Sequence, residues 1–270
     1  MHRDSLGDRM KEQYEDRTRY LLPRRTYTII RVDGKSFHTY TRDCQRPYDA
    51  GLMDDMDATA KALWENMEGA QIAYVQSDEI SVLLTDFEGQ QTEAWFDGNL
   101  QKMTSLSASI ATAHFNRART FRRVTHETAL RPGREDPYAY FDSRAFVIPD
   151  AVEVENYFIW RGQDAARNSV SMTAQAHFPH ERLQGKSSSE MQEMLWQEKG
   201  VNWNDQPAGF KRGRCVVRKL VEKDAVYVDK RTGETKTATG VRRASWQVVA
   251  PPIFTQDRDW LRGRIPRHPE

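Results

Sequence analysis

The stretch Tyr27-Thr-Ile-Ile-Arg-Val-Asp-Gly34 decides the fold of the first half of the chain. Residues 27–32 are rich in β-branched side chains, which favour a strand, and Asp33-Gly34 is typical of a turn. A glycine beside a carboxylate lets the backbone approach a ligand closely. The stretch therefore predicts a first strand with a candidate site at its carboxyl end.

Hydrophobic spacing predicts the next elements. Apolar residues recur at intervals of three and four from Leu52 to Met67, behind the potential cap Asp49, which predicts an amphipathic helix. The short apolar segments 72–75 and 80–84 flank Gln76-Ser77-Asp78-Glu79, which indicates a hairpin.

A second apolar stripe over residues 100–110 predicts a helix, and residues 145–148 predict a fourth strand. The order βαββαβ is that of a ferredoxin-like α+β fold, in which the third strand lies antiparallel beside the first. We therefore expect Asp33 to lie next to Asp78 and Glu79, so that three carboxylates converge.

The second half of the chain reads as helical first and stranded later. Residues 152–175 contain helical stretches, and Ser187-Ser188-Ser189-Glu190 matches a capping box that opens a short helix ending near Gly200. The predicted strands are 215–221, 225–229 and 245–249. Helix-breaking residues before the fourth strand suggest a boundary near residues 145–150.

Composition excludes several classes of protein. Lys and Arg number 40 against 39 Asp and Glu, so nucleic-acid binding requires local charge clusters, and Arg and Lys gather in 114–134, 211–219 and 258–267. Cys44 and Cys215 are the only cysteines, which excludes a disulfide scaffold or a Cys-rich zinc site. Without an apolar run of about 20 residues, we expect a soluble cytoplasmic protein.

The candidate site has the ligand types that Mg²⁺ prefers. Asp33 and Asp78 offer carboxylates, Gly34 offers a carbonyl, and Glu79 is placed to orient a ligand or a second metal ion. Nearby cations suit phosphates: Arg31, Lys35, Arg42, Arg46 and Lys102. Each of these residues also has a simpler interpretation. The acids are common in turns, the cations are ordinary solvated charges, and Phe37 is a core residue beside a surface His38.

Several motifs together resemble one family. The chain resembles the tRNA-histidine guanylyltransferase family, and especially its guanylyltransferase-like branch. The matching motifs follow the family's order along the chain: Arg31–His38, Tyr74–Ser81, Phe141–Pro149, Asn156–Asp164, Gly185-Lys186 and Gly200–Asn204. The resemblance implies a polymerase-type palm over residues 1–148 and a fingers-like, RNA-binding region over 149–270. It also implies nucleotide addition to a tRNA 5′ end in the 3′-to-5′ direction, with two Mg²⁺ ions, ATP and GTP as substrates, and a homotetramer.

The resemblance also assigns roles to residues. Asp33, Asp78 and Glu79 are the implied catalytic acids, with Asp33, Gly34 and Asp78 as metal ligands. The implied nucleotide-binding residues are Gly34, Lys35, Ser36, Phe37, His38, Arg46, Ser77 and Lys102. The implied RNA-binding residues are Arg144, Arg161, Arg167, Asn168, Lys186, Lys211 and Arg212.

One departure from the family pattern bears on the substrate. Members specific for tRNA-histidine carry His-Ile-Asn-Asn where this chain has Ala166-Arg167-Asn168-Ser169, and Gly162 replaces a common Gln. The sequence therefore favours template-directed repair of truncated tRNA 5′ ends over addition of G(−1) to tRNA-histidine.

Two further functions compete with this interpretation. One is that of a palm enzyme that makes cyclic nucleotides or extends 3′ ends, and the ordered motifs of the second half argue against it. The second is that of a non-catalytic RNA-binding protein. Clustered acids argue against the second, because they repel RNA unless metal ions neutralise them.

Overall fold

The computed structural model describes residues 4–125 and 137–268 and confirms the βαββαβ order. An amphipathic helix forms where the apolar stripe predicts it, and Asp49 caps that helix by accepting a hydrogen bond from Leu52 N at 2.8 Å. The elements of this half are β1 (Tyr27–Gly34), α3 (Ala50–Asn66), β2 (Ala70–Gln76), β3 (Glu79–Leu84), α4 (Leu100–Thr125) and β4 (Phe141–Ile148).

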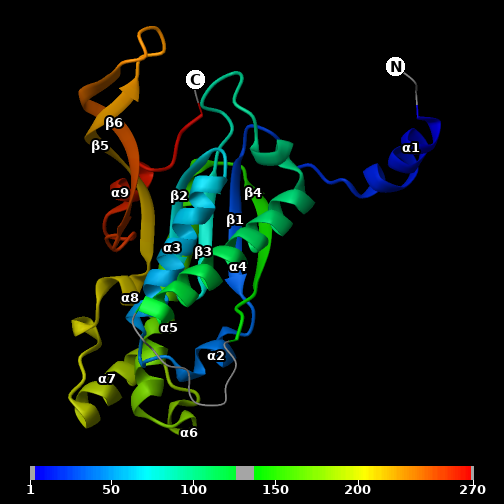
Figure 1. Cartoon of the computed structure of the whole chain (residues 1–270). Coiled ribbons are helices and arrows are strands. Elements are labelled where there is room, and N and C mark those ends of the chain that lie inside the picture. The colour runs from blue at the N-terminus through cyan, green and yellow to red at the C-terminus, as the bar shows by residue number, and fades with distance from the viewer. Residues whose placement is uncertain (1–3, 126–136, 269–270) are drawn as a thin grey trace.

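These strands belong to a six-stranded antiparallel sheet of order β4-β1-β3-β2-β5-β6. The strands β5 (Arg214–Val228) and β6 (Thr235–Val249) form a long hairpin, and the start of β5 pairs with β2. Figure 1 shows this hairpin extending beyond the body of the molecule. The sheet therefore passes across the predicted boundary near residue 148 and joins the two halves.

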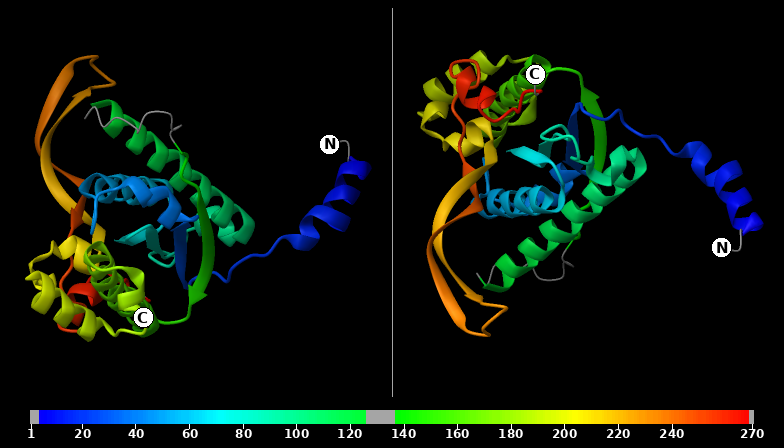
Figure 2. Two further views of the ribbon diagram at one scale, coloured as in Figure 1. Left: turned by 90° about the horizontal axis from the view of Figure 1, so that it is seen from below. Right: turned by 90° about the horizontal axis from the view of Figure 1, so that it is seen from above.

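The two faces of the sheet are covered by different helices. Ile30 and Val32 point to the core under α3 and α4, whereas Ile29 lies in the second core under α5 (Ala151–His177). The helices can be followed on the two faces in Figures 1 and 2. Because strand side chains alternate, Arg31 and Asp33 share the α5 face with Ile29.

Shorter elements complete the chain. Ser187 and Glu190 form the predicted capping box of α7 (Ser188–Lys199), and Gly200 ends that helix with φ 65°. An N-terminal arm leads away from the body (Figure 1). The remaining elements are α1 (Ser5–Met10), α2 (Phe37–Tyr40), α6 (His180–Leu183), α7 (Ser188–Lys199), α8 (Ala208–Arg212), α9 (Arg258–Arg262), a π-helical turn (Lys11–Glu15) and 3₁₀ turns (Asp16–Thr18, Thr41–Asp43, Trp95–Gly98, Trp203–Asp205).

Three strand predictions needed correction, and one of them, 245–249, is only the end of β6 (Thr235–Val249). The fourth strand begins at Phe141 rather than at residue 145, which brings Asp142 opposite Asp33. Segments 215–221 and 225–229 form the single strand β5, because a register shift after residue 223 absorbs the irregularity without ending the strand. Within the described ranges, no helix is both long and apolar enough to cross a membrane.

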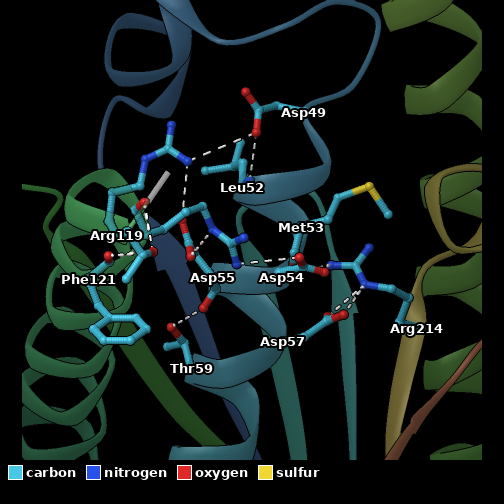
Figure 3. A network of polar contacts seen from close by, with 12 residues as sticks. Asp49, Leu52, Met53, Asp54, Asp55, Asp57, Thr59, Arg119, Phe121 and Arg214 are labelled. Carbon is cyan, nitrogen blue, oxygen red and sulfur yellow. Dashed lines mark hydrogen bonds and ion pairs between the residues drawn. The ribbon is translucent and has the colours of Figure 1, made fainter. Parts of the chain in front are cut away.

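A buried carboxylate ties α3 to α4. Asp55 is 1% exposed and accepts hydrogen bonds from Arg119 Nη1 at 3.1 Å and Arg122 Nε at 2.8 Å. Figure 3 shows this network beside the Asp57–Arg214 ion pair. The expectation that 114–134 forms an RNA-facing basic cluster is therefore wrong for Arg119 and Arg122, and part of that segment, residues 126–136, lies outside the described residues.

We predict that Asp55→Asn destabilises the fold. The substitution leaves two guanidinium groups without their carboxylate, so the free energy of unfolding should fall by about 3 kcal/mol in urea denaturation. Asp54→Asn is the matched control, because Asp54 is 66% exposed and its 3.4 Å ion pair with Arg122 should be worth less than about 0.5 kcal/mol. Equal effects of the two substitutions would contradict the central place of Asp55 in the network.

Candidate active site

The site lies where β1 ends beside the β2–β3 turn. Antiparallel pairing sets Asp33 opposite Glu79 of β3 and Asp142 of β4. Gly34 N donates a hydrogen bond to the carbonyl oxygen of Asp78 at 3.2 Å, and Ser77 adopts a left-handed backbone with φ 47°. This geometry fixes the turn that carries Asp78 against the residue that follows Asp33.

A cavity of about 380 Å³ opens between this turn and α5. Its walls include Asp33, Asp78 and Glu79 from the sheet and Arg161, Asp164 and Asn168 from α5. The helix therefore supplies a second wall of charged and amide side chains, and Asp164 is a lining residue that the sequence analysis did not single out.

Asp78 lies where its negative charge is disfavoured. Burial is the main cause that raises its pKa from 3.8 to about 6, and the negative charges of Asp33 and, more weakly, Glu79 act in the same sense, whereas hydrogen bonds at Asp78 and Ser77 oppose it. A hard cation such as Mg²⁺ prefers oxygen ligands and neutralises the negative charge of neighbouring carboxylates. Asp33, Asp78 and the Gly34 carbonyl therefore fit Mg²⁺ chemically.

The Glu79 carboxylate is paired with an arginine, so it is not free to bind a cation together with Asp33 and Asp78. Its two carboxylate oxygens accept hydrogen bonds from Arg161 Nε at 2.8 Å and Nη2 at 2.7 Å, and both side chains are buried. In the described part of the chain, no three His, Cys, Asp or Glu side chains are grouped to hold a metal ion. The three carboxylates therefore line one cavity, as expected, but Glu79 is paired with Arg161. Arg161 is an internal partner of Glu79 rather than an RNA-facing residue.

The loop after β1 divides into exposed and buried positions. Lys35, Ser36 and His38 lie toward solvent at this end of the sheet, whereas Phe37 lies in the core against Phe115 and Phe141. A side chain at Gly34 would collide with the Phe37 ring, so the turn requires glycine. The structure agrees with the simpler interpretation of a core Phe37, whose ring is packed on other aromatic rings and is not free to bind a nucleotide.

Lys102 lies far from the carboxylates. It sits in the first turn of α4, where Leu100 N bonds to Tyr20 O, close to the start of β1 rather than its end. The strand from Tyr27 to Asp33 spans about 20 Å at 3.3 Å per residue. Within one subunit the structure therefore contradicts the expected contact of Lys102 with the same phosphates. Arg46 and Ser77 are exposed at the carboxylate end.

The predicted RNA-binding residues differ in accessibility. Arg167 is exposed and bonds to Asp164, Asn168 lines the cavity, and Arg144 is half exposed beside Asp142. Lys186 is exposed and pairs with Glu190, and Arg212 is half-buried.

Lys211 corrects an expectation, because it is 6% exposed and its ammonium is bonded to the carbonyl of Asn204. The remaining basic clusters are also partly used inside the fold. Arg214 pairs with Asp57, and Arg258 and Arg262 both pair with the buried Glu155. Arg214 is thereby held inside the fold, whereas Arg258 and Arg262 pair with Glu155 and stay about half exposed.

An apolar cavity of about 60 Å³ adjoins the polar one and was missed by sequence reasoning. The two share Gln76, Ser77, Asn168 and Met172. The rings of Tyr48 and Phe210 lie 5.0 Å apart between centroids, and the rest of the lining includes Leu52, Met53, Ala165 and Gly209. Tyr48 and Phe210 come from a loop and a short helix, where no hydrophobic period marks them.

With this geometry in view, comparison with known proteins decides the family. Residues 7–149 match the family tRNAHis guanylyltransferase, and residues 152–252 match the Thg1 C terminal domain. The chain belongs to the tRNAHis guanylyltransferase family. It is therefore a member of a nucleotidyltransferase family, which confirms the resemblance predicted from the motifs and the palm-like α+β fold.

Relatives cover most of the chain. The tRNA(His) guanylyltransferase of Debaryomyces hansenii is 30% identical over 77% of this chain and 78% of its own length. A bacterial tRNA(His) guanylyltransferase (Thg1)-like protein solved with ATP is 42% identical, with a TM-score of 0.79 over 97% of this chain and 99% of that one. A GTP complex of a protein with the same description gives 39% and 0.75 over the same shares, and the Saccharomyces cerevisiae enzyme gives 26% and 0.63 over 77% and 91%.

We predict that Asp78→Asn stabilises the metal-free protein at neutral pH. The pKa of Asp78 is higher in the folded chain (about 6) than its ordinary value of 3.8, so ionisation lowers stability as pH rises from 4 to above 6. In EDTA at pH 7.5 the variant should gain about 2–3 kcal/mol in urea denaturation. At pH 4 the gain should shrink below about 1 kcal/mol.

Asp142→Asn is the control for this prediction, because Asp142 is 61% exposed. Its substitution should leave the pH dependence of stability unchanged. If Asp78→Asn is no more stable than the parent at pH 7.5, then ionisation of Asp78 does not lower the free energy of unfolding, and the prediction is wrong.

Proposed function

We propose that this chain is a template-dependent 3′-to-5′ nucleotidyltransferase that adds nucleotides to the 5′ end of tRNA and so repairs truncated ends. The observation that carries the proposal is the Asp33–Asp78 pair at the mouth of a polar cavity. Similarity to proteins solved with ATP and with GTP supports nucleoside triphosphates as substrates. A cytoplasmic homotetramer is part of the proposal on family resemblance alone.

The proposed reaction has two displacements at phosphorus. In the first, an oxygen of the RNA 5′-monophosphate attacks the α-phosphorus of ATP, and pyrophosphate leaves. In the second, the 3′-hydroxyl of the incoming nucleotide attacks the activated 5′-phosphorus, and AMP leaves. Positioning and charge neutralisation dominate such transfers, which agrees with a site built from acids, amides and cations.

Asp33, Asp78 and the Gly34 carbonyl are the groups proposed to hold Mg²⁺, with two ions serving both steps. When bound, the ions supply neutralisation of phosphate charge and a lower pKa for the attacking hydroxyl. The side chains of Lys35, His38 and Arg46 lie on the loops at the same end of the sheet and are proposed to attract the triphosphate.

The apolar cavity is proposed to receive the nucleotide base. Tyr48 and Phe210 offer aromatic faces, and Ser77 links this cavity to the carboxylates. A base held there would direct its phosphates past Ser77 toward Asp78. Asn168 on α5 lines both cavities, and Arg167 is exposed beside Asp164 of the polar cavity. Both side chains are proposed to contact the RNA end.

The departure at residues 166–169 supports repair of truncated tRNA 5′ ends over addition of G(−1) to tRNA-histidine. Ala166 and Ser169 stand where tRNA-histidine-specific members carry larger polar side chains. The second candidate function is addition of G(−1) to tRNA-histidine, which the names of the curated relatives favour.

The test uses purified protein with Mg²⁺, ATP, labelled GTP and two 5′-monophosphorylated RNAs. The first RNA is a tRNA that lacks its 5′-terminal nucleotide, a G that would pair with the opposite strand. The second is tRNA-histidine that lacks G(−1). We expect template-matched extension of the truncated tRNA, reduced at least about 10³-fold by Asp33→Ala and by Asp78→Ala because charge stabilisation is lost.

Asp54→Ala, on the exposed side of α3, is the control that should keep full activity. Extension of tRNA-histidine alone would replace repair with G(−1) addition. RNA binding without incorporation into either RNA would contradict the enzyme and favour a non-catalytic RNA-binding protein.

We predict that Phe210→Ala raises the KM for the nucleoside triphosphate about 10- to 100-fold, since stacking on an aromatic side chain is worth about 1–3 kcal/mol per base. Steady-state kinetics with varied GTP measures the change. Phe121→Ala, which removes a 70% exposed ring on α4, should leave KM unchanged. An unchanged KM for Phe210→Ala would place the base elsewhere.

A further inference from the structure

We propose that Arg161 is a positioning residue that keeps the Glu79 carboxylate out of the cation site, so that Asp33 and Asp78 form that site as a pair. The inference rests on the proposed function, because it concerns the same cavity. In this proposal, a buried arginine of α5 determines which carboxylates of the sheet bind the cation.

The contacts of Arg161 hold it in a single orientation. Its guanidinium meets both oxygens of Glu79 at 2.8 and 2.7 Å, and Nη2 also donates to Asp164 Oδ2 at 2.8 Å. The guanidinium carbon lies 4.4 Å from the ring centroid of Trp160. Such a two-pronged pairing of arginine with a carboxylate fixes geometry as well as charge.

Among the described residues, the other hydrogen bonds to the Glu79 side chain are long. Gln76 Nε2 and Ser81 Oγ reach its Oε1 at 3.4 Å each. Glu79 follows Asp78 in the chain, pairs in register with Asp33 and borders the same cavity. Without Arg161, two positive charges would remain for Glu79: Arg31, at the diagonal register position on the same face of the sheet, and a cation between the two aspartates. The divalent cation carries the higher charge, so the Glu79 side chain would turn toward it.

Removal of Arg161 has a signature that loss of a purely structural ion pair would not have. Loss of a structural contact loosens a nearby site or leaves it unchanged. Release of Glu79 instead adds a third carboxylate, and affinity for hard cations rises with the charge of the ligand set. Removal of Arg161 should therefore tighten cation binding while it slows nucleotide addition.

The experiment measures Mn²⁺ binding to the nucleotide-free protein by electron paramagnetic resonance. The parent should bind Mn²⁺ in a manner abolished by Asp33→Ala combined with Asp78→Ala. Arg161→Met should bind Mn²⁺ about tenfold more tightly, since one ligand charge is added. The double variant Glu79→Gln with Arg161→Met should return to the parent affinity, because the released side chain is then neutral.

Arg161→Lys provides a second route if Arg161→Met does not fold. Lysine keeps the positive charge but cannot pair with both carboxylate oxygens of Glu79 as the guanidinium does. We therefore expect Mn²⁺ to bind about threefold more tightly, and Glu79→Gln should again reverse this change. Measured 5′ extension should fall in Arg161→Met and recover at least partly in the double variant.

The outcomes separate the two proposals. If the parent binds no Mn²⁺, or binds it without the aspartates, the proposed metal site is wrong and the role of Arg161 falls with it. If binding needs both aspartates but Arg161→Met and Arg161→Lys leave affinity unchanged or weaker, only the positioning role is overturned.

Discussion

The antiparallel pairing of β1 with β3 is the constraint on which the rest of the structure depends. It sets Asp33 opposite Glu79, and the hydrogen bond from Gly34 N to the Asp78 carbonyl then closes the β2–β3 turn against the end of β1. Local forces support the arrangement: the left-handed Ser77 makes the turn, and the absent side chain of Gly34 leaves room for the Phe37 ring. Two acids distant in the chain thereby meet at one edge of a cavity.

Bringing these acids together costs stability, and the fold offsets this locally with α5. Burial and the neighbouring carboxylates raise the pKa of Asp78, so the metal-free site opposes its own ionisation. Arg161 balances Glu79, and Asp164 joins Arg161 to the exposed Arg167. The helix α5 therefore covers one face of the sheet and also supplies the positive charge that pairs with Glu79. This ion pair links the palm-like half to the region after residue 149.

Sequence periodicity predicted the βαββαβ order, the capping residues Asp49 and Ser187, and the neighbourhood of Asp33 and Asp78. These features follow from local pattern and topology. The errors concern contacts between segments. Phe37, Lys211 and Lys102 have the right residue types, but packing buries the first two and α4 carries the third to the far end of the sheet. Tyr48 and Phe210 could not be found, since no spacing reports that a loop and a short helix share a cavity.

The most direct test of the central claim is cleavage of the backbone by hydroxyl radicals generated from Fe²⁺ bound in place of Mg²⁺. We expect cuts in three separate segments: after β1 near residues 33–35, at the turn near 77–79, and on α5 near 161–168. Asp33→Ala should abolish all of them together. Cuts confined to one segment, or cuts that persist without Asp33, would contradict a cation site formed where β1, the β2–β3 turn and α5 meet.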